Sequence, residues 1–119
     1  MNILFDHCVP KPLRRPFPAH HIRTAAQMGC KGLQNGKLLA QAATAFDVLL
    51  TVDKNIKSQQ NLDKLPIAVV ILDAPTNTSE VLAPFAPFVE LLLSTIQPGQ
   101  MWEIDCTGKL TRIGGDSVD

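Results

Sequence analysis

The sequence contains no tyrosine, one tryptophan and three cysteines, and these scarcities argue against several classes of protein. Cys8, Cys30 and Cys106 show no Cys-x-x-Cys spacing, so we expect free thiols rather than a disulfide framework. One tryptophan is too little for a nucleic-acid groove that works by stacking bases on aromatic rings. The longest apolar run, residues 67–72, is far shorter than the ~20 residues that cross a membrane, so no membrane span is expected.

The apolar content is that of a folded globular domain. Hydrophobic residues make up 45% of the 119 residues, which excludes intrinsic disorder, and the length predicts one domain over residues 1–119. Residues 1–6 lack the charged and long apolar regions of a signal peptide. Together with the free cysteines, this predicts a cytoplasmic protein.

Charge is distributed unevenly along the chain, although the formal net charge is zero. Residues 1–37 contain six basic residues and one acidic residue, whereas residues 38–119 contain five basic and ten acidic residues. This asymmetry is compatible with a basic face that binds an anionic polymer, and also with an ordinary solvated surface.

Apolar runs at residues 2–5, 48–52 and 67–72 predict buried strands, and residues 21–25 predict a further one. Prolines bracket one or two helical turns near Leu13. Asn35 can cap a helix, whose apolar face comprises Leu38, Leu39, Ala42, Ala43 and Phe46. Residues 54–64 are polar and predict an irregular loop with a short helix.

The last third of the chain predicts a helix and then a hairpin. Ser79 can cap the helix, and Pro84 and Pro87 weaken its first turns, so we expect its regular part to begin near Pro84. Its core-facing residues are Leu82, Phe85, Val89, Leu92 and Ile96. A hairpin is predicted over about residues 100–114, and residues 115–119 are expected to fray.

Strands that alternate with helices predict an α/β fold with a parallel sheet covered on both faces. Sites in such sheets form beyond the carboxyl ends of the strands. Asp6 ends the first strand, Thr51 and Asp53 lie at the end of another, and Asn35 opens the intervening helix. We expect these residues to converge, so that two carboxylates and an amide oxygen can hold Mg²⁺. The other interpretation is that these aspartates only cap helices or turns.

Three segments carry a resemblance to a known family. They are Asn2-Ile3-Leu4-Phe5-Asp6, Asn35-Gly36-Lys37-Leu38-Leu39-Ala40-Gln41-Ala42 and Val48-Leu49-Leu50-Thr51-Val52-Asp53-Lys54-Asn55. In this order and spacing they resemble the PIN-like nuclease superfamily over roughly residues 1–97, and more closely its small single-domain branch long labelled as a domain of unknown function.

The resemblance implies a three-layer α/β/α fold with a central parallel sheet of four or five strands, followed here by the C-terminal hairpin. It implies an endoribonuclease that uses Mg²⁺ or Mn²⁺ to cut single-stranded RNA. Family members are often toxins paired with a small antitoxin protein, and often homodimers. Asp6 matches the first acid of the family, Asp53 matches the acid of its T-x-D motif, and Asn35 lies where an aspartate is usual. These three residues would therefore bind the metal and carry catalysis.

Further substrate contacts are expected from residues near this edge: Thr51, Lys54, Arg14, Arg15, Lys37 and His7. The sequence also departs from the family pattern, because Lys37 lies where relatives often carry a glutamate and Asn55 where a second aspartate is common. The alternative is therefore a catalytically degenerate PIN-like domain that binds nucleic acid or a partner protein. A phosphoacceptor receiver domain fits less well, because the acidic pair and the late lysine that it needs are missing.

Overall fold

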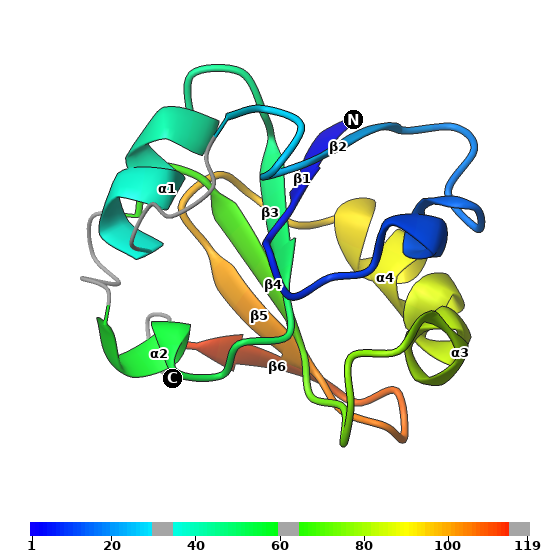
Figure 1. The fold of residues 1–119 in the computed structure, drawn as a ribbon. Helices are drawn as coiled ribbons and strands as arrows, with labels where there is room; N and C mark the ends of the chain where they lie inside the picture. The colour runs from blue at the N-terminus through cyan, green and yellow to red at the C-terminus, as the bar shows by residue number, and fades with distance from the viewer. Residues whose placement is uncertain (30–34, 60–64, 115–119) are drawn as a thin grey trace.

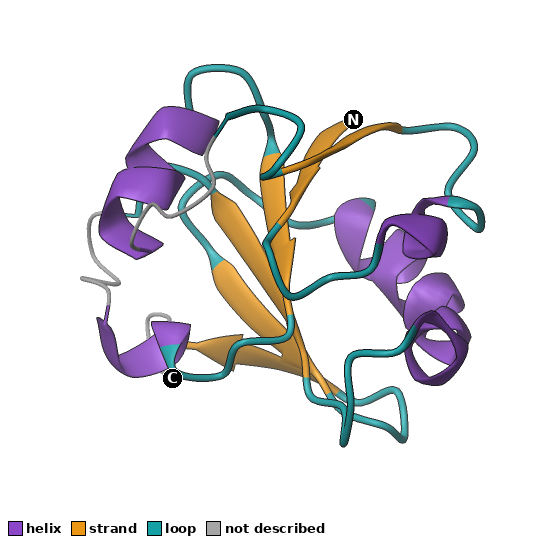
Figure 2. Cartoon of the chain, viewed as in Figure 1, coloured by secondary structure: helices purple, strands orange, loops and turns teal. Residues whose placement is uncertain are grey.

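The computed structural model describes residues 1–29, 35–59 and 65–114, which form a mixed α/β fold on one six-stranded sheet (Figures 1 and 2). The strand order across the sheet is β2-β1-β3-β4-β5-β6. The first five strands are parallel to one another, and β6 pairs antiparallel with β5. The strands are β1 (Asn2–Phe5), β2 (His21–Thr24), β3 (Val48–Thr51), β4 (Ala68–Leu72), β5 (Met101–Ile104) and β6 (Leu110–Ile113).

Helical segments cover both faces of this sheet (Figure 1). One face carries α1 (Asn35–Ala42) and α2 (Ile56–Gln59). The other face carries the 3-10 turn η1 (Lys11–Arg14) and a run formed by α3 (Ser79–Leu82), η3 (Ala83–Phe85) and α4 (Ala86–Leu93). No helix in the described ranges is long and apolar enough to span a bilayer.

The central strands are buried on both sides, which explains why their sequences are nearly all apolar instead of alternating. Every residue of β3 and β4 is buried. Phe5 and Val70 belong to a core that includes Val89 of α4, whereas Leu49 belongs to a second core that includes Leu39 of α1. The sheet therefore separates two hydrophobic cores and is held rigidly between them.

The predicted strands at residues 2–5, 48–52 and 67–72 are confirmed within one residue at their ends, as is the strand near residues 21–25. Five strands are parallel, which is within the predicted four or five, and β6 adds a sixth, antiparallel strand to the same sheet. The polar loop contains the short helix α2. Residues 60–64 of that loop and the tail 115–119 lie outside the described residues.

The helix that follows β4 begins one residue earlier than the sequence predicted. Thr78, not Ser79, is the N-cap, because the Thr78 hydroxyl accepts a hydrogen bond from the Val81 N–H at 3.3 Å. Pro84 and Pro87 each lie in the first turn of a new helical segment, where the missing N–H is tolerated. The prolines therefore divide the predicted helix into α3, η3 and α4.

Candidate functional site

The carboxyl ends of the parallel strands meet along one edge of the sheet, which we call the carboxyl edge. Asp6 directly follows β1, and its N–H donates to the Leu50 carbonyl of β3 at 2.9 Å. Asp73 directly follows β4, and its N–H donates to the Ile104 carbonyl of β5 at 2.8 Å. These backbone bonds extend the strand pairing by one residue and fix both acids at this edge.

Asp6 is a buried acidic residue, with an exposed fraction of 5%. Its Oδ1 accepts a hydrogen bond from the His7 N–H at 2.7 Å, and its Oδ2 accepts one from the Thr51 hydroxyl at 2.7 Å. The Cys8 Sγ lies 3.9 Å from the same Oδ2. Burying a carboxylate is unfavourable unless it is hydrogen-bonded, so these donors explain how Asp6 is accommodated and oriented.

Asp53 is connected to Asp6 through a single hydroxyl group. The Thr51 Oγ donates to Asp6 and accepts a hydrogen bond from the Asp53 N–H at 3.0 Å. The Asp53 Oδ1 in turn accepts from the Asn55 N–H at 3.0 Å, which closes a tight turn after β3. One of the two Asp53 carboxylate oxygens therefore caps this turn, as the turn-capping interpretation predicted.

The two acids line the same open pocket at the carboxyl edge. This pocket has a volume of about 350 Å³, and its walls are formed by Asp6, His7, Cys8, Val52 and Asp53. Two acids from separate segments thus face one volume, as the strand-end rule predicted. Asn35 begins α1, and its side chain lies outside the described part of the structure.

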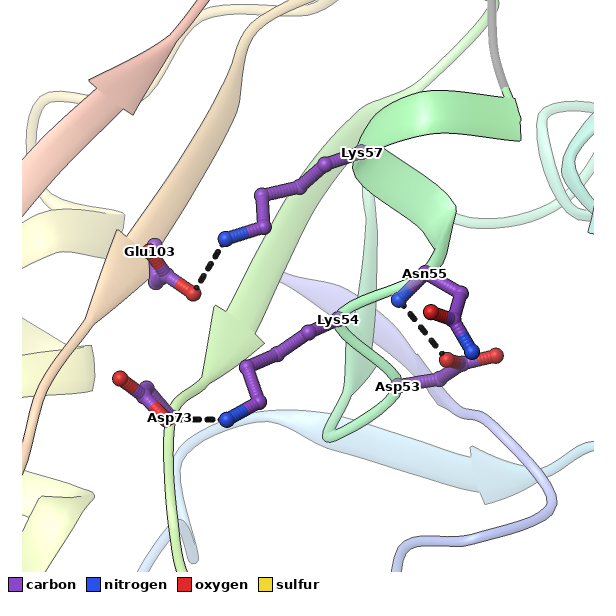
Figure 3. A network of polar contacts seen from close by, with 6 residues as sticks. All are labelled: Asp53, Lys54, Asn55, Lys57, Asp73 and Glu103. Carbon is purple, nitrogen blue, oxygen red and sulfur yellow. Dashed lines mark hydrogen bonds and ion pairs between the residues drawn. The ribbon is translucent and has the colours of Figure 1, made fainter.

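Two lysines that follow β3 are paired with acids from the other side of the sheet edge, Asp73 after β4 and Glu103 in β5 (Figure 3). Lys54 Nζ lies 2.8 Å from Asp73 Oδ1, and Lys57 Nζ lies 2.9 Å from Glu103 Oε2. The hydrogen bond and the negative charge of Asp73 raise the pKa of Lys54 above its ordinary value of 10.5. Asp73 and Glu103 are therefore each matched by a positive charge.

Asp6 and Asp53 differ from these two acids in their electrostatic environment. Among the residues that the structure describes, no lysine, arginine or histidine lies within ion-pair distance of either one. Within the same ranges, no group of three or more acidic, histidine or cysteine side chains is arranged to hold a metal ion. Asp6 and Asp53 each contribute a carboxylate to the pocket wall, and carboxylates are the hard oxygen ligands that Mg²⁺ and Mn²⁺ prefer.

The other predicted substrate contacts are not all near this pocket. His7 lines it, and Lys54 is not a lining residue but directly follows Asp53, which is one. Arg15 instead lines a separate pocket of about 260 Å³ between η1 and α3. Arg14 and Lys37 are exposed on η1 and α1 and are not among the residues that line the Asp6–Asp53 pocket.

Two residues of the carboxyl edge were missed by sequence reasoning. Asp73 follows a predicted strand directly, and the same signal that identified Asp6 would have found it. Glu103 lies within β5 and pairs with a lysine 46 positions away, for which the sequence carries no local signal. Comparison with profiles of known protein families, with curated proteins and with solved structures yields no match to this chain.

Proposed function

We propose that this chain is a ribonuclease dependent on Mg²⁺ or Mn²⁺, with the three-layer arrangement and C-terminal hairpin of a PIN-like domain. The observation that carries the proposal is the shared pocket of Asp6 and Asp53, which lack a cationic partner among the described residues. Carboxylates held near one another repel, and a divalent cation relieves that repulsion.

The donor chemistry of the pocket fits such an ion. Asp6 and Asp53 would hold it through carboxylate oxygens, and the resemblance adds the amide oxygen of Asn35. When bound, the ion supplies an activated water for phosphodiester hydrolysis and stabilises the charge that develops on the phosphate.

Three groups of the chain itself prepare the pocket for this role. The Thr51 hydroxyl and the His7 N–H fix the two oxygens of Asp6, so its orientation is set in advance. The exposed His7 side chain lies at the pocket wall, where an imidazole can donate a hydrogen bond to a phosphate. Preorganised donors of this kind act without rearrangement during the reaction.

A binding module without catalytic activity is the second candidate. It is favoured by one observation, that the described residues offer two acids rather than three in the pocket. Fewer carboxylates bind Mg²⁺ more weakly, so a protein with this donor set can retain a nucleic-acid or protein surface without cleaving RNA. Single-stranded RNA as the ligand, pairing with a small antitoxin, and a homodimer all follow from the resemblance alone.

Cleavage of mixed-sequence single-stranded RNA distinguishes the two candidates. The wild type is expected to cleave with Mn²⁺ and to stop when EDTA is added, and an Asp6→Asn/Asp53→Asn variant is expected to lose about 100-fold in rate. Glu80→Gln, which removes one exposed acid from α3, is the control for the loss of a negative charge outside the pocket and should cleave normally. Equal cleavage by the wild type and the double variant would refute the proposed site, and no cleavage by either would favour the binding module.

A further inference from the structure

Asp53 and Lys54 are neighbours in the sequence, but their side chains diverge (Figure 3). Asp53 turns toward the Asn55 N–H, whereas Lys54 extends across the carboxyl edge to Asp73 at the end of β4. The Lys54 ammonium therefore lies at the end of β4, on the side of Asp53 opposite to Asn55. A carboxylate oxygen 2.8 Å from that ammonium occupies the kind of position that a phosphate oxygen would take.

The Lys54–Asp73 pair is much more exposed than the other ion pair at this edge. The side chains of Lys54 and Asp73 are 51% and 40% exposed, against 32% and 17% for Lys57 and Glu103. Exposed pairs contribute little to stability, because water and salt screen them. The pair is also not needed to join its two strands, since the register from Val48 to Thr51 already pairs β3 with β4.

Lys54 thus has an ammonium group whose acidic partner, 2.8 Å away, is itself exposed to solvent. Another anion can replace a partner of this kind, because water and salt screen the pair. An ammonium binds phosphate oxygens as a point charge, without the fixed geometry that a guanidinium requires.

We propose that Lys54 is a contact for the RNA phosphate backbone and that Asp73 restrains it by competing with phosphate for the same ammonium. The bound strand then runs from the Asp6–Asp53 pocket over the ends of β3 and β4. It does not run toward Arg15, which lies in a separate pocket beside α3. This inference takes its ligand class, single-stranded RNA, from the proposed function.

The test is a double-mutant cycle on RNA binding, measured by fluorescence anisotropy with a short, labelled single-stranded RNA of mixed sequence. EDTA is present throughout, so binding is measured without metal-dependent cleavage. The variants are Lys54→Gln, Asp73→Asn and their combination, with Lys54→Arg as the charge-conserving variant. Glu80→Gln is the matched control for losing one exposed negative charge.

Lys54→Gln is expected to weaken RNA binding about 5-fold. The slope of the logarithm of the binding constant against the logarithm of the salt concentration should become shallower by about 0.7, the value for one lost phosphate contact to a single strand. Lys54→Arg should bind within about 2-fold of the wild type. Asp73→Asn should tighten binding about 3-fold in the wild type, yet have almost no effect in the Lys54→Gln background. Glu80→Gln should change nothing.

Three results would overturn the inference. They are an unchanged affinity and salt slope for Lys54→Gln, an equal gain from Asp73→Asn with and without Lys54, and a wild type that does not bind the RNA. A further result distinguishes the Lys54 phosphate contact from the proposed nuclease activity. If the cycle behaves as expected but Mn²⁺ produces no cleavage, the phosphate contact stands and the nuclease activity is refuted.

Discussion

Replacing Thr51 with valine removes one hydroxyl group and preserves the shape of the side chain. That hydroxyl donates to the Asp6 carboxylate at 2.7 Å and accepts from the Asp53 N–H at 3.0 Å, and Thr51 is fully buried. A hydrogen bond to a charged group contributes about 1.5–3 kcal/mol, and leaving the partly buried Asp53 N–H unpaired adds roughly 1 kcal/mol. Thr51→Val should therefore lower the free energy of unfolding by about 3 kcal/mol.

Thr51→Ser is the matched control, because it keeps the hydroxyl and removes only a methyl group. Its expected loss is about 1 kcal/mol, from reduced apolar burial. The free energies of unfolding of both variants can be measured by urea denaturation, followed by the fluorescence of Trp102, the single tryptophan of the chain, which lies in β5. The slope of the transition should not change between variants. Equal losses for valine and serine would refute the reasoning, since the hydroxyl would then contribute nothing.

The same pair of variants reports on the site. A residue that orients a metal ligand typically changes metal affinity by about 10–100-fold when its hydrogen bond is removed. Thr51→Val is therefore expected to weaken Mn²⁺ binding by that factor, whereas Thr51→Ser should bind Mn²⁺ as the wild type does. A loss of stability without any change in Mn²⁺ affinity would limit Thr51 to a structural role.

Two further predictions concern the loop between β5 and β6. Gly108 has φ +88°, and a Cβ there would lie 2.5 Å from the Phe88 ring, so Gly108→Ala should destabilise by about 2–3 kcal/mol in urea denaturation. Gly99→Ala is the control, because Gly99 has φ +83° but the nearest atom to an added Cβ lies at 3.4 Å. This variant should lose only the roughly 1–2 kcal/mol of stability that comes from the unfavourable backbone conformation. Equal losses of stability for the two variants would contradict the proposed clash with Phe88. The Asp105 carboxylate accepts the Thr107 hydroxyl at 2.6 Å, and this bond lowers the pKa of Asp105 below its ordinary 3.8. The ionised Asp105 carboxylate stabilises the folded protein above pH 3.8, and this stabilisation is lost as the pH falls through the lower pKa of Asp105 in the folded state. The urea midpoints of the wild type and of Asp105→Ala should therefore differ at neutral pH and converge in acid. A difference that stays constant with pH would contradict this assignment.

The positions of the strands could be predicted because burial on both faces leaves a plain signal. Residues 48–50 and 68–72 are apolar without interruption, which is what strands between two cores require. The order of the strands could not be predicted in the same way, because periodicity does not say which strands are neighbours. The Thr78 cap was missed for a related reason, since both Thr78 and Ser79 carry a suitable hydroxyl and only the backbone geometry decides between them.

The convergence of Asp6 and Asp53 on one pocket followed from a general rule on parallel sheets, and the structure places both acids there. The connection through Thr51 was only partly foreseen, because a hydrogen bond was expected beside Asp53 but not the link to Asp6. The Lys57–Glu103 pair depends on how far α2 reaches across the sheet, which sequence spacing does not encode.

A Mn²⁺ titration followed by electron paramagnetic resonance can determine whether Asp6 and Asp53 share one divalent ion, as we propose. The wild type should bind one Mn²⁺, and Asp6→Asn and Asp53→Asn should each weaken that binding by at least about 10-fold. Asp73→Asn, which changes an acid at the same edge that is already paired with a lysine, should bind Mn²⁺ as the wild type does. Undiminished Mn²⁺ binding by Asp6→Asn or Asp53→Asn would contradict the account.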